Sequence, residues 1–260
     1  MKETRVESWL ELQRELFDDM WNEELGAFRS DLAYRGRRNA QDDLATSLVR
    51  LGGDAADLER HLLRNFRKYA ASDSVPADSP WDWLALGKHH GLPTRLLDWT
   101  YSPYVALHFA TAHAGEDAAD AVVWALDYVR AHELLPDRLR ERLAAEGANV
   151  FTTELLADAA PSIDELGDEE FVLFVEPPSF DERIVNQYAL FSLASSPTLS
   201  PDEWLARHPD LARRIVVPAE LKWEVRDKLD QANVTERVIY PGLDGLSRWL
   251  KRYYSPRPGG

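Results

Sequence analysis

Apolar residues recur at helical spacing in several stretches of this chain. Near the N-terminus, Val6, Trp9, Leu16 and Met20 share one face from Thr4 onward and predict an amphipathic helix. The same spacing predicts further helices over 54–71, 81–90, 102–114, 136–147 and 243–253, and one that begins near residue 218.

Short apolar runs between these helices predict β-strands. The runs cover residues 31–36, 121–126, 171–176, 183–193 and 238–240. They are scattered among the helices without regular alternation, which favours an α+β fold over a doubly wound parallel sheet. We therefore expect one compact α+β domain with mixed or antiparallel central sheets and peripheral helices.

The composition along the chain suggests how this domain is organised. The opening helix, within residues 1–28, is expected to pack on a main domain of residues 29–253. Residues 154–170 are acidic and predict a mobile linker or insertion, and the Ser, Asp and Pro content of residues 72–80 predicts a loop. Residues 254–260 are expected to form a flexible tail.

The charge of the chain is strongly negative but unevenly distributed. The 260 residues carry a net charge of −15, which disfavours a uniformly basic surface for nucleic acid. Residues 29–68 nevertheless contain nine Lys and Arg against six Asp and Glu, whereas residues 114–183 contain five against eighteen. A local anion-binding site is thus expected in the first of these segments.

Composition also excludes several kinds of chemistry. There is no cysteine, so disulfides, thiolate metal sites and a cysteine nucleophile are ruled out. The first residues lack the apolar core of a signal peptide, and no apolar run has the length of a membrane span. We expect a cytoplasmic protein with no membrane partner.

The densest group of aromatic, imidazole, guanidinium and carboxylate side chains lies in residues 81–110, WDWLALGKHHGLPTRLLDWTYSPYVALHFA. Gly91 ends the first helix here, so His89 and His90 lie at the C-terminal end of that helix. Apolar and polar residues do not alternate regularly over residues 94–100, so this segment does not match a half-exposed strand. It is expected to form a polar connection between two buried helices. Within this connection, Arg95 and Asp98 are three residues apart, which suggests an ion pair unless Asp98 acts in a site.

Familiar catalytic and metal-binding motifs do not occur. The sequence contains no GxSxG, GxxxxGK[ST], HExxH or GxGxxG. The one histidine group to consider as metal ligands is His89, His90, His108 and His113. However, His108 and His113 are five residues apart on one predicted helix and lie on different faces. No metal site is predicted.

Several of these stretches are similar to the signature of the FRG domain family. That family is named for a Phe-Arg-Gly tripeptide, here Tyr34-Arg35-Gly36, and carries a QHxGLPTRLLDWT-type core, here within residues 87–100. Further likeness occurs at 183–191 and 238–246. The chain departs from the pattern at Lys88, where the family has Gln, and at Tyr188-Ala189, which follow Gln187 in place of a Gln/Gly-like pair.

The order of these motifs also resembles the three-part pattern of ADP-ribosyltransferases. The resemblance implies that Arg35 on a first strand holds NAD, that Thr94 and its neighbours shape the nicotinamide pocket, and that Gln187 stands where these enzymes have a glutamate. Apolar Val185 and Ala189 at two-residue spacing would place Gln187 on a strand facing the cleft. The expected catalytic residues are Gln187, Arg35 and His89, and the expected NAD-binding residues are Tyr34, Arg35, Gly36, His90, Thr94, Arg95 and Asp98.

The resemblance implies an NAD-dependent ADP-ribosyltransferase-like enzyme with a macromolecular acceptor, either protein or nucleic acid. The family's bacterial contexts imply a toxin or an anti-phage defence effector, with a neutralising antitoxin among its expected partners. One alternative is a non-catalytic module that binds a nucleotide or phosphorylated ligand through Arg35, Arg37, Arg38 and Arg95. Another is a hydrolase in which His89 is the general base and Asp98 orients it.

Overall fold

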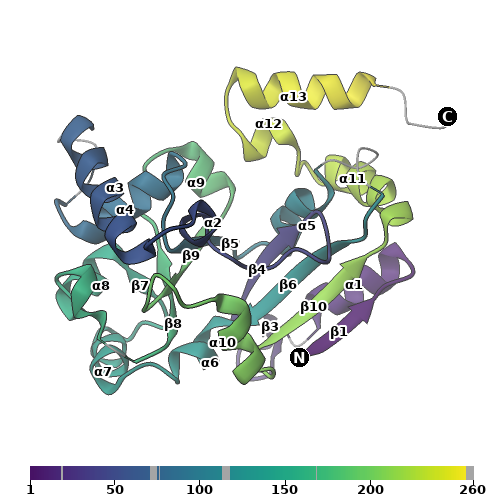
Figure 1. Cartoon of the computed structure of the whole chain (residues 1–260). Helices are drawn as coiled ribbons and strands as arrows, with labels where there is room; N and C mark the ends of the chain where they lie inside the picture. The colour runs from purple at the N-terminus through teal and green to yellow at the C-terminus, as the bar shows by residue number, and fades with distance from the viewer. Residues whose placement is uncertain (19, 71–74, 76, 113–117, 168, 256–260) are drawn as a thin grey trace.

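The chain folds into a single α+β domain around one large mixed sheet (Figure 1). The computed structural model describes residues 1–18, 20–70, 75, 77–112, 118–167 and 169–255. Eight strands follow one another across the sheet: β1 (Lys2–Arg5), β10 (Ala212–Val217), β6 (Ala121–Asp127), β4 (Leu32–Arg37), β5 (Leu96–Thr100), β9 (Ala189–Ala194), β8 (Val172–Glu176) and β7 (Phe151–Thr152).

Neighbouring strands are antiparallel except at the two edges of the sheet, where β1 runs parallel to β10 and β7 runs parallel to β8. The sheet is nearly divided at its centre. Within the described residues, β4 and β5 pair only at Tyr34 and Thr100, whereas β4 pairs with β6 along its whole length. The two halves of the sheet therefore separate next to this pair.

One half of the sheet, from β1 to β4, is covered on one face by α1 (Trp9–Phe17), α5 (Pro103–Thr111) and α11 (Lys222–Gln231). Leu12, Ala106 and Val225 from these helices pack with Val123 and Ile215 of the sheet in one buried cluster. The opposite face carries α6 (Tyr128–His132) and α10 (Pro201–Arg207). Strand β6 is thus buried on both faces.

The other half of the sheet packs against α3 (Ala55–Tyr69), α4 (Pro80–His89), α7 (Asp137–Glu146) and α8 (Thr153–Ala159). The remaining elements are the short helices α2 (Ser47–Leu51), α9 (Glu182–Asn186), α12 (Glu236–Ile239), η1 (Ile163–Leu166) and η2 (Ala219–Leu221), the helix α13 (Leu243–Tyr254), and a small ribbon of β2 (Trp21–Asn22) and β3 (Ala27–Phe28). The helix α13 lies at the outside of the molecule above α12 (Figure 1).

The predicted helix start at Ser102 and Pro103 is confirmed. The Oγ atom of Ser102 accepts a hydrogen bond from the Val105 amide at 3.3 Å, and Pro103 occupies the first turn of α5. A second Ser-Pro pair, Ser79 and Pro80, begins α4 in the same way.

Two expectations for the N-terminal part were wrong. Residues 2–5 form strand β1, so the opening helix begins at Trp9 and not near Thr4. Residues 96–100 form strand β5, which has a run of buried residues on both sides of the exposed Asp98. Burial on both faces removes the alternation that marks a half-exposed strand.

Two expectations for the C-terminal part were also wrong. The segment 183–193 is not one strand, because Asp181 caps the helix α9 and β9 begins only at Ala189. The run 238–240 lies at the end of α12 instead of in a strand.

The acidic segment 154–170, expected as a mobile linker or insertion, contains most of α8 and the helix η1, and its Leu156 and Leu166 are buried.

Some expectations fall on residues that the structure does not describe. They concern most of 71–76 in the predicted loop, the predicted helix end at residues 113–114 with His113, and the tail beyond residue 255. In the part of the chain that is described, no helix combines the length and the apolar character needed to cross a membrane.

Candidate functional site

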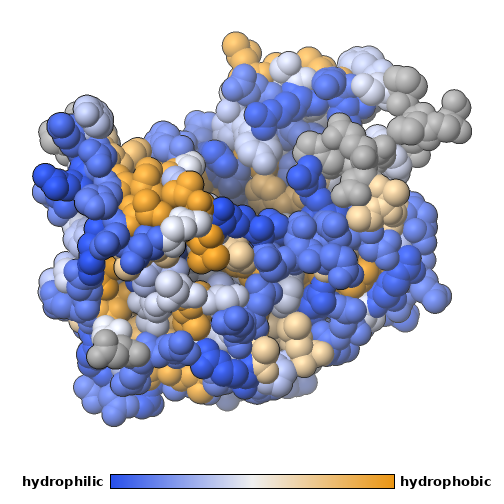
Figure 2. Space-filling model, in the orientation of Figure 1, coloured by the Kyte–Doolittle hydropathy of each residue, from blue (hydrophilic) through white to orange (hydrophobic). Residues whose placement is uncertain are grey.

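A cleft of about 750 Å³ opens where β4 and β5 separate. Its walls come from β4, the end of α4, β5, α5, α9 and the start of β9, together with Tyr240 after α12. Figure 2 shows the molecule hollowed beneath α12 and α13. Among the described residues of the lining, five are basic (Arg35, Arg37, Arg38, Lys88 and Arg183) and two are acidic (Asp42 and Asp98). The cleft is therefore a local positive region on a chain with a net charge of −15.

The floor of the cleft holds a cluster of Arg35, Lys88 and Asp98. Lys88 Nζ lies 2.7 Å from Asp98 Oδ2, and Arg35 Nη1 donates to the Asp98 backbone carbonyl at 2.5 Å and lies 3.9 Å from Oδ2. Both cationic side chains are 13% exposed, whereas the Asp98 side chain is 58% exposed to the solvent in the cleft. The carboxylate thus points into open space while its two partners lie below it.

This environment keeps the carboxylate ionised. The surrounding protein alone would raise the pKa of Asp98, but the positive charges of Lys88 and Arg35 and the hydrogen bond from Lys88 outweigh it and lower that pKa below its usual value. Burial lowers the pKa of Arg35 to about 10, and the nearby charges of Arg37 and Arg50 act in the same direction. Arg35 still carries its proton at neutral pH.

Arg35 also has an unused hydrogen-bond donor. Its Nε atom is buried, and no acceptor among the described residues bonds to it. The Nε atom of Arg37 is in the same situation, although Arg37 Nη2 pairs with Asp42 at 3.0 Å. Buried donors without acceptors are uncommon, and an anionic ligand in the cleft would supply acceptors here.

The two adjacent histidines make different contacts. His89 Nε2 lies 2.7 Å from Asp181 Oδ2, and its side chain is only 8% exposed. His90 caps α4 through its backbone amide and has an exposed side chain. Both line the cleft. The hypothetical pairing of His89 with Asp98 is wrong, because Asp181 is the carboxylate that His89 contacts.

Gln187 lines the cleft, but it follows α9 and does not lie within a strand. Its Nε2 donates to the Ile239 carbonyl at 3.1 Å, and its backbone carbonyl accepts from Thr100 Oγ1 at 2.7 Å. The predicted face shared with Val185 and Ala189 does not exist, because Val185 belongs to the helix. No described residue donates to the side-chain oxygen of Gln187, so this acceptor remains available in the cleft.

The other two residues of the Tyr-Arg-Gly tripeptide serve the fold. The Tyr34 ring is fully buried, and its hydroxyl donates to the Leu16 carbonyl at 3.2 Å. At Gly36, a Cβ atom would lie 1.8 Å from the Ala106 carbonyl oxygen. Glycine is required there because α5 crosses directly over β4. Both residues border the cleft, and only Arg35 extends a charged side chain from this tripeptide.

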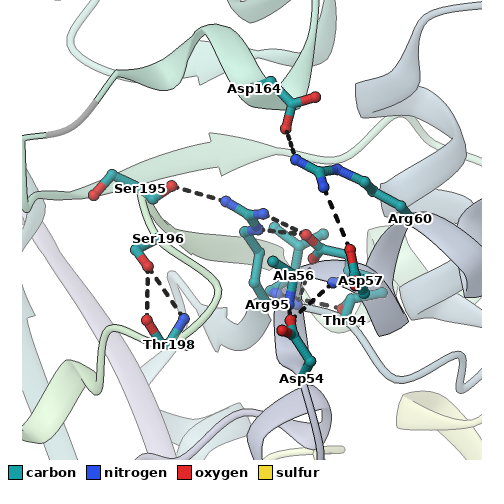
Figure 3. A network of polar contacts seen from close by, with 12 residues as sticks. Asp54, Ala56, Asp57, Arg60, Thr94, Arg95, Asp164, Ser195, Ser196 and Thr198 are labelled. Carbon is teal, nitrogen blue, oxygen red and sulfur yellow. Dashed lines mark hydrogen bonds and ion pairs between the residues drawn. The ribbon is translucent and has the colours of Figure 1, made fainter.

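Thr94 and Arg95 do not line this cleft. Arg95 lies under α3, where its guanidinium pairs with the buried Glu59 and donates to the Ser195 carbonyl at 2.8 Å (Figure 3). Thr94 is fully buried, and its amide donates to Ser47 Oγ. The expected ion pair between Arg95 and Asp98 is wrong.

Several residues of the cleft were not expected as functional, among them Lys88, Arg183 and Tyr240. Lys88 was noted only as a departure from the family pattern. Arg183 comes from α9 and Tyr240 follows α12, and the guanidinium carbon of Arg183 lies 5.5 Å from the centre of the Tyr240 ring. Their one signal in the sequence is that each lies in a segment similar to the FRG family.

The cleft suits an anion with a sugar or aromatic part. Its cations can hold phosphates, Asp98 and the Gln187 oxygen can accept from hydroxyl groups, and Phe109 and Tyr240 offer aromatic surface. The described part of the chain contains no group of three His, Asp or Glu side chains arranged to hold a metal ion.

Comparison with known proteins gives one match. The FRG domain model matches residues 30–119, a segment that contains both the Tyr-Arg-Gly tripeptide and the stretch 81–110. The resemblance to this family is confirmed over these residues. No curated protein and no solved structure matches the chain.

Proposed function

We propose that this chain, which has an FRG domain at residues 30–119, binds NAD in the cleft and transfers its ADP-ribose to a macromolecule. One observation carries the proposal. Arg35 of β4, Asp98 of β5 and Gln187, which lies just before β9, line one positive cleft, and these three strands are neighbours in the sheet. Thr94, the expected nicotinamide-pocket residue, lies outside the cleft, and Asp98 of the same stretch takes its place in the proposal.

In this proposal the pyrophosphate lies against the cations of the cleft. Arg35 has a buried donor without an acceptor, and Arg38 and Arg183 have no ion pair with a described residue. A guanidinium presents a planar fork of donors that matches phosphate oxygens. Arg35 would be the central contact because its hydrogen bond to the Asp98 carbonyl already fixes its position.

Cleavage of NAD breaks the bond between the ribose C1′ atom and the nicotinamide nitrogen. Nicotinamide leaves with the bonding electron pair as a neutral molecule, and positive charge develops on the ribose. The ionised Asp98 would stabilise that charge, and the Gln187 oxygen would accept a hydrogen bond from a ribose hydroxyl. The acceptor then attacks C1′ and loses a proton, for which His89, a residue of the lining held by Asp181, would be the base.

The test is incubation of the chain with labelled NAD and cell lysate, with release of nicotinamide and transfer of label both measured. Asp98→Asn should reduce single-turnover nicotinamide release by about 100-fold or more, which is typical for loss of one group that stabilises transition-state charge. Gln187→Ala should reduce release more than NAD affinity, and Gln187→Glu should retain or raise it. Asp210→Asn, which removes an exposed carboxylate paired with Arg130, is the control.

Calorimetry separates the binding step from the chemistry. Arg35→Ala should lose NAD affinity without unfolding, and Arg35→Lys should recover little of it because an ammonium lacks the guanidinium fork. Arg64→Ala removes an exposed arginine of α3 and should leave affinity unchanged. Wild-type affinity in folded Arg35→Ala, or wild-type release in folded Asp98→Asn, would contradict the assigned roles.

A second candidate function is binding of a nucleotide without turnover. It is favoured by the ion pair at 2.7 Å between Lys88 and Asp98, because Lys88 offsets the negative charge that catalysis would use, and Gln187 is neutral. This module would bind NAD or a related nucleotide in calorimetry and release no nicotinamide. The same two measurements therefore distinguish the two functions.

A further inference from the structure

Two arginines of β4 lie on the same face of the sheet beside the cleft. Side chains alternate between the two faces along a strand, so Arg35 and Arg37 share the face on which Ala33 is buried, whereas Tyr34 and Gly36 face α5. The Cα atoms of the two arginines are about 6.6–6.8 Å apart, which is the rise of two residues in a strand. Both residues line the cleft.

The two guanidinium groups are held by different segments. Arg35 Nη1 donates to the Asp98 carbonyl of β5, and Arg37 Nη2 pairs with Asp42 in the loop after β4. In each side chain the Nε atom is buried and has no acceptor among the described residues. Burial lowers the pKa of Arg35 most, and the positive charge of Arg37 lowers it further, so the two cations are close enough to repel each other. The cleft thus has two unused donors at two places along β4.

The positive charge of the cleft also exceeds the negative charge of NAD. The described lining has five basic and two acidic side chains, and both acids pair with cations of the lining, Asp42 with Arg37 and Asp98 with Lys88. NAD carries a net charge of about −1, because its nicotinamide ring offsets one of the two pyrophosphate charges, and a phosphate monoester would add about −1.5 to −2 at pH 7. A dinucleotide with one more phosphate therefore matches the charge of the lining better than NAD does.

We propose that the preferred dinucleotide of the cleft is NADP, with Arg35 on its pyrophosphate and with Arg37 and Arg38 on the 2′-phosphate of its adenosine ribose. This inference rests on the proposed function, which places a dinucleotide in the cleft. The two phosphorus atoms of a pyrophosphate share one bridging oxygen, so that group matches one position along β4, whereas the 2′-phosphate lies across the ribose from it. Arg38 directly follows Arg37, is exposed and has no ion pair with a described residue, so it adds a second guanidinium fork at this end of the cleft.

Asp42 distinguishes this arrangement from a site built for NAD. A carboxylate beside the adenosine ribose can accept a hydrogen bond from the free 2′-hydroxyl of NAD, whereas an arginine there accommodates a 2′-phosphate. The Asp42 carboxylate is 3.0 Å from Arg37 Nη2 and its side chain is 37% exposed, so it occupies part of the arginine that the phosphate would use. Loss of its charge should therefore strengthen NADP binding, and it would weaken NAD binding if Asp42 held the 2′-hydroxyl.

Calorimetric titration of the full chain with NAD and with NADP is the test. Wild type should bind NADP about 10–100-fold more tightly, which is the effect of a hydrogen bond to a charged group. Arg37→Ala and Arg38→Ala should each lower this ratio of affinities at least about fivefold, and Arg37→Lys should recover little of it because an ammonium lacks the guanidinium fork. Asp42→Asn should raise NADP affinity about two- to fivefold. Arg130→Ala, which removes an arginine paired with an aspartate outside the cleft, is the matched control and should leave the ratio unchanged.

The outcomes separate this inference from the proposed function. Equal affinities of wild type for the two dinucleotides, or tighter binding of NAD, would overturn the preference for NADP and leave the proposed function intact. A fall in NAD affinity in folded Asp42→Asn, with circular dichroism as the check of folding, would also overturn it. Binding of neither dinucleotide would overturn the proposed function together with this inference. A preference for NADP without release of nicotinamide from either dinucleotide would support the inference and contradict the transfer reaction.

Discussion

The buried ion pair of Arg95 and Glu59 should be one of the largest single contributions to the stability of this fold. The two side chains are 6% and 2% exposed, and they join β5 to α3. Arg95 Nε donates to Glu59 Oε2 at 2.7 Å, and the Arg95 amide donates to Oε1 at 3.1 Å. A third bond runs from Arg95 Nη1 to the Ser195 carbonyl, so the pair also fixes the end of β9.

Removal of one partner should cost far more than removal of both. Glu59→Leu leaves a buried guanidinium without its counter-charge, which typically costs about 3–5 kcal/mol. For a chain of this size that corresponds to a fall in melting temperature of roughly 6–20 °C. The double variant Glu59→Leu with Arg95→Met buries no charge, but the Arg95 amide and the Ser195 carbonyl lose their partners, so we expect a net loss of about 2 kcal/mol.

Urea denaturation of wild type, both single variants and the double variant measures the coupling between the two side chains. The matched control is Asp164→Asn, which breaks an exposed ion pair between Asp164 and Arg60 of α3. This change should leave the urea midpoint nearly unchanged. Additive effects of the two single changes, or a stable Glu59→Leu variant with native melting, would refute the reasoning. A loss of NAD affinity in an Arg95→Met variant of native stability would show that Arg95 acts in the ligand site.

Three further predictions concern single residues. Lys88→Met should raise the pKa of Asp98 towards its ordinary value because a nearby positive charge is lost, and an unchanged carboxyl titration by NMR would contradict the contact. Gly36→Ala should destabilise the chain by about 1–3 kcal/mol or more, measured in urea, because the new methyl group meets the Ala106 carbonyl; native stability would show that α5 can move away. The pKa of Glu236 is lowered from 4.5 to about 2: burial opposes this shift, and the hydrogen bond from an arginine and two positive charges outweigh it. The stability that its carboxylate contributes is therefore complete above pH 4.5 and is lost as pH falls towards 2. Glu236→Gln should flatten the pH dependence of the free energy of unfolding between pH 2 and 4.5. An unaltered pH profile in this variant would contradict the assigned pKa shift.

The fold class could be predicted because most helices and strands carry their own local signals. The buried run 121–126 and the Ser-Pro helix start at Ser102 depend on neighbouring residues alone. β5 could not be predicted in this way, because both of its faces are buried and its residues show no alternation. Strand β1 has a burial pattern typical of an exposed edge, and its pairing with β10 depends on residues more than 200 positions away.

The misassigned strand also explains why part of the site was predicted wrongly. Arg95 comes directly before β5 and Asp98 lies at its middle. In extended backbone, side chains three residues apart point to opposite faces, so these two cannot meet. Asp98 consequently faces the cleft, and Arg95 faces α3. Glu59, the true partner of Arg95, is 36 positions upstream and has no local signal. Residues identified by the family signature, such as Arg35 and His89, do line the cleft.

The pairing of β1 with β10 determines when the sheet can be finished during synthesis. Lys2 lies opposite Arg213, and β1 is an edge strand whose sole neighbour in the sheet is β10 among the described residues. At about 5–20 residues per second, the ribosome needs roughly 10–40 s to make the chain between them. β1 thus leaves the ribosome long before β10 exists and is among the last strands of this sheet to pair. A protein fused ahead of Lys2 is attached to a strand that pairs late, so its folding proceeds while β1 is still unpaired.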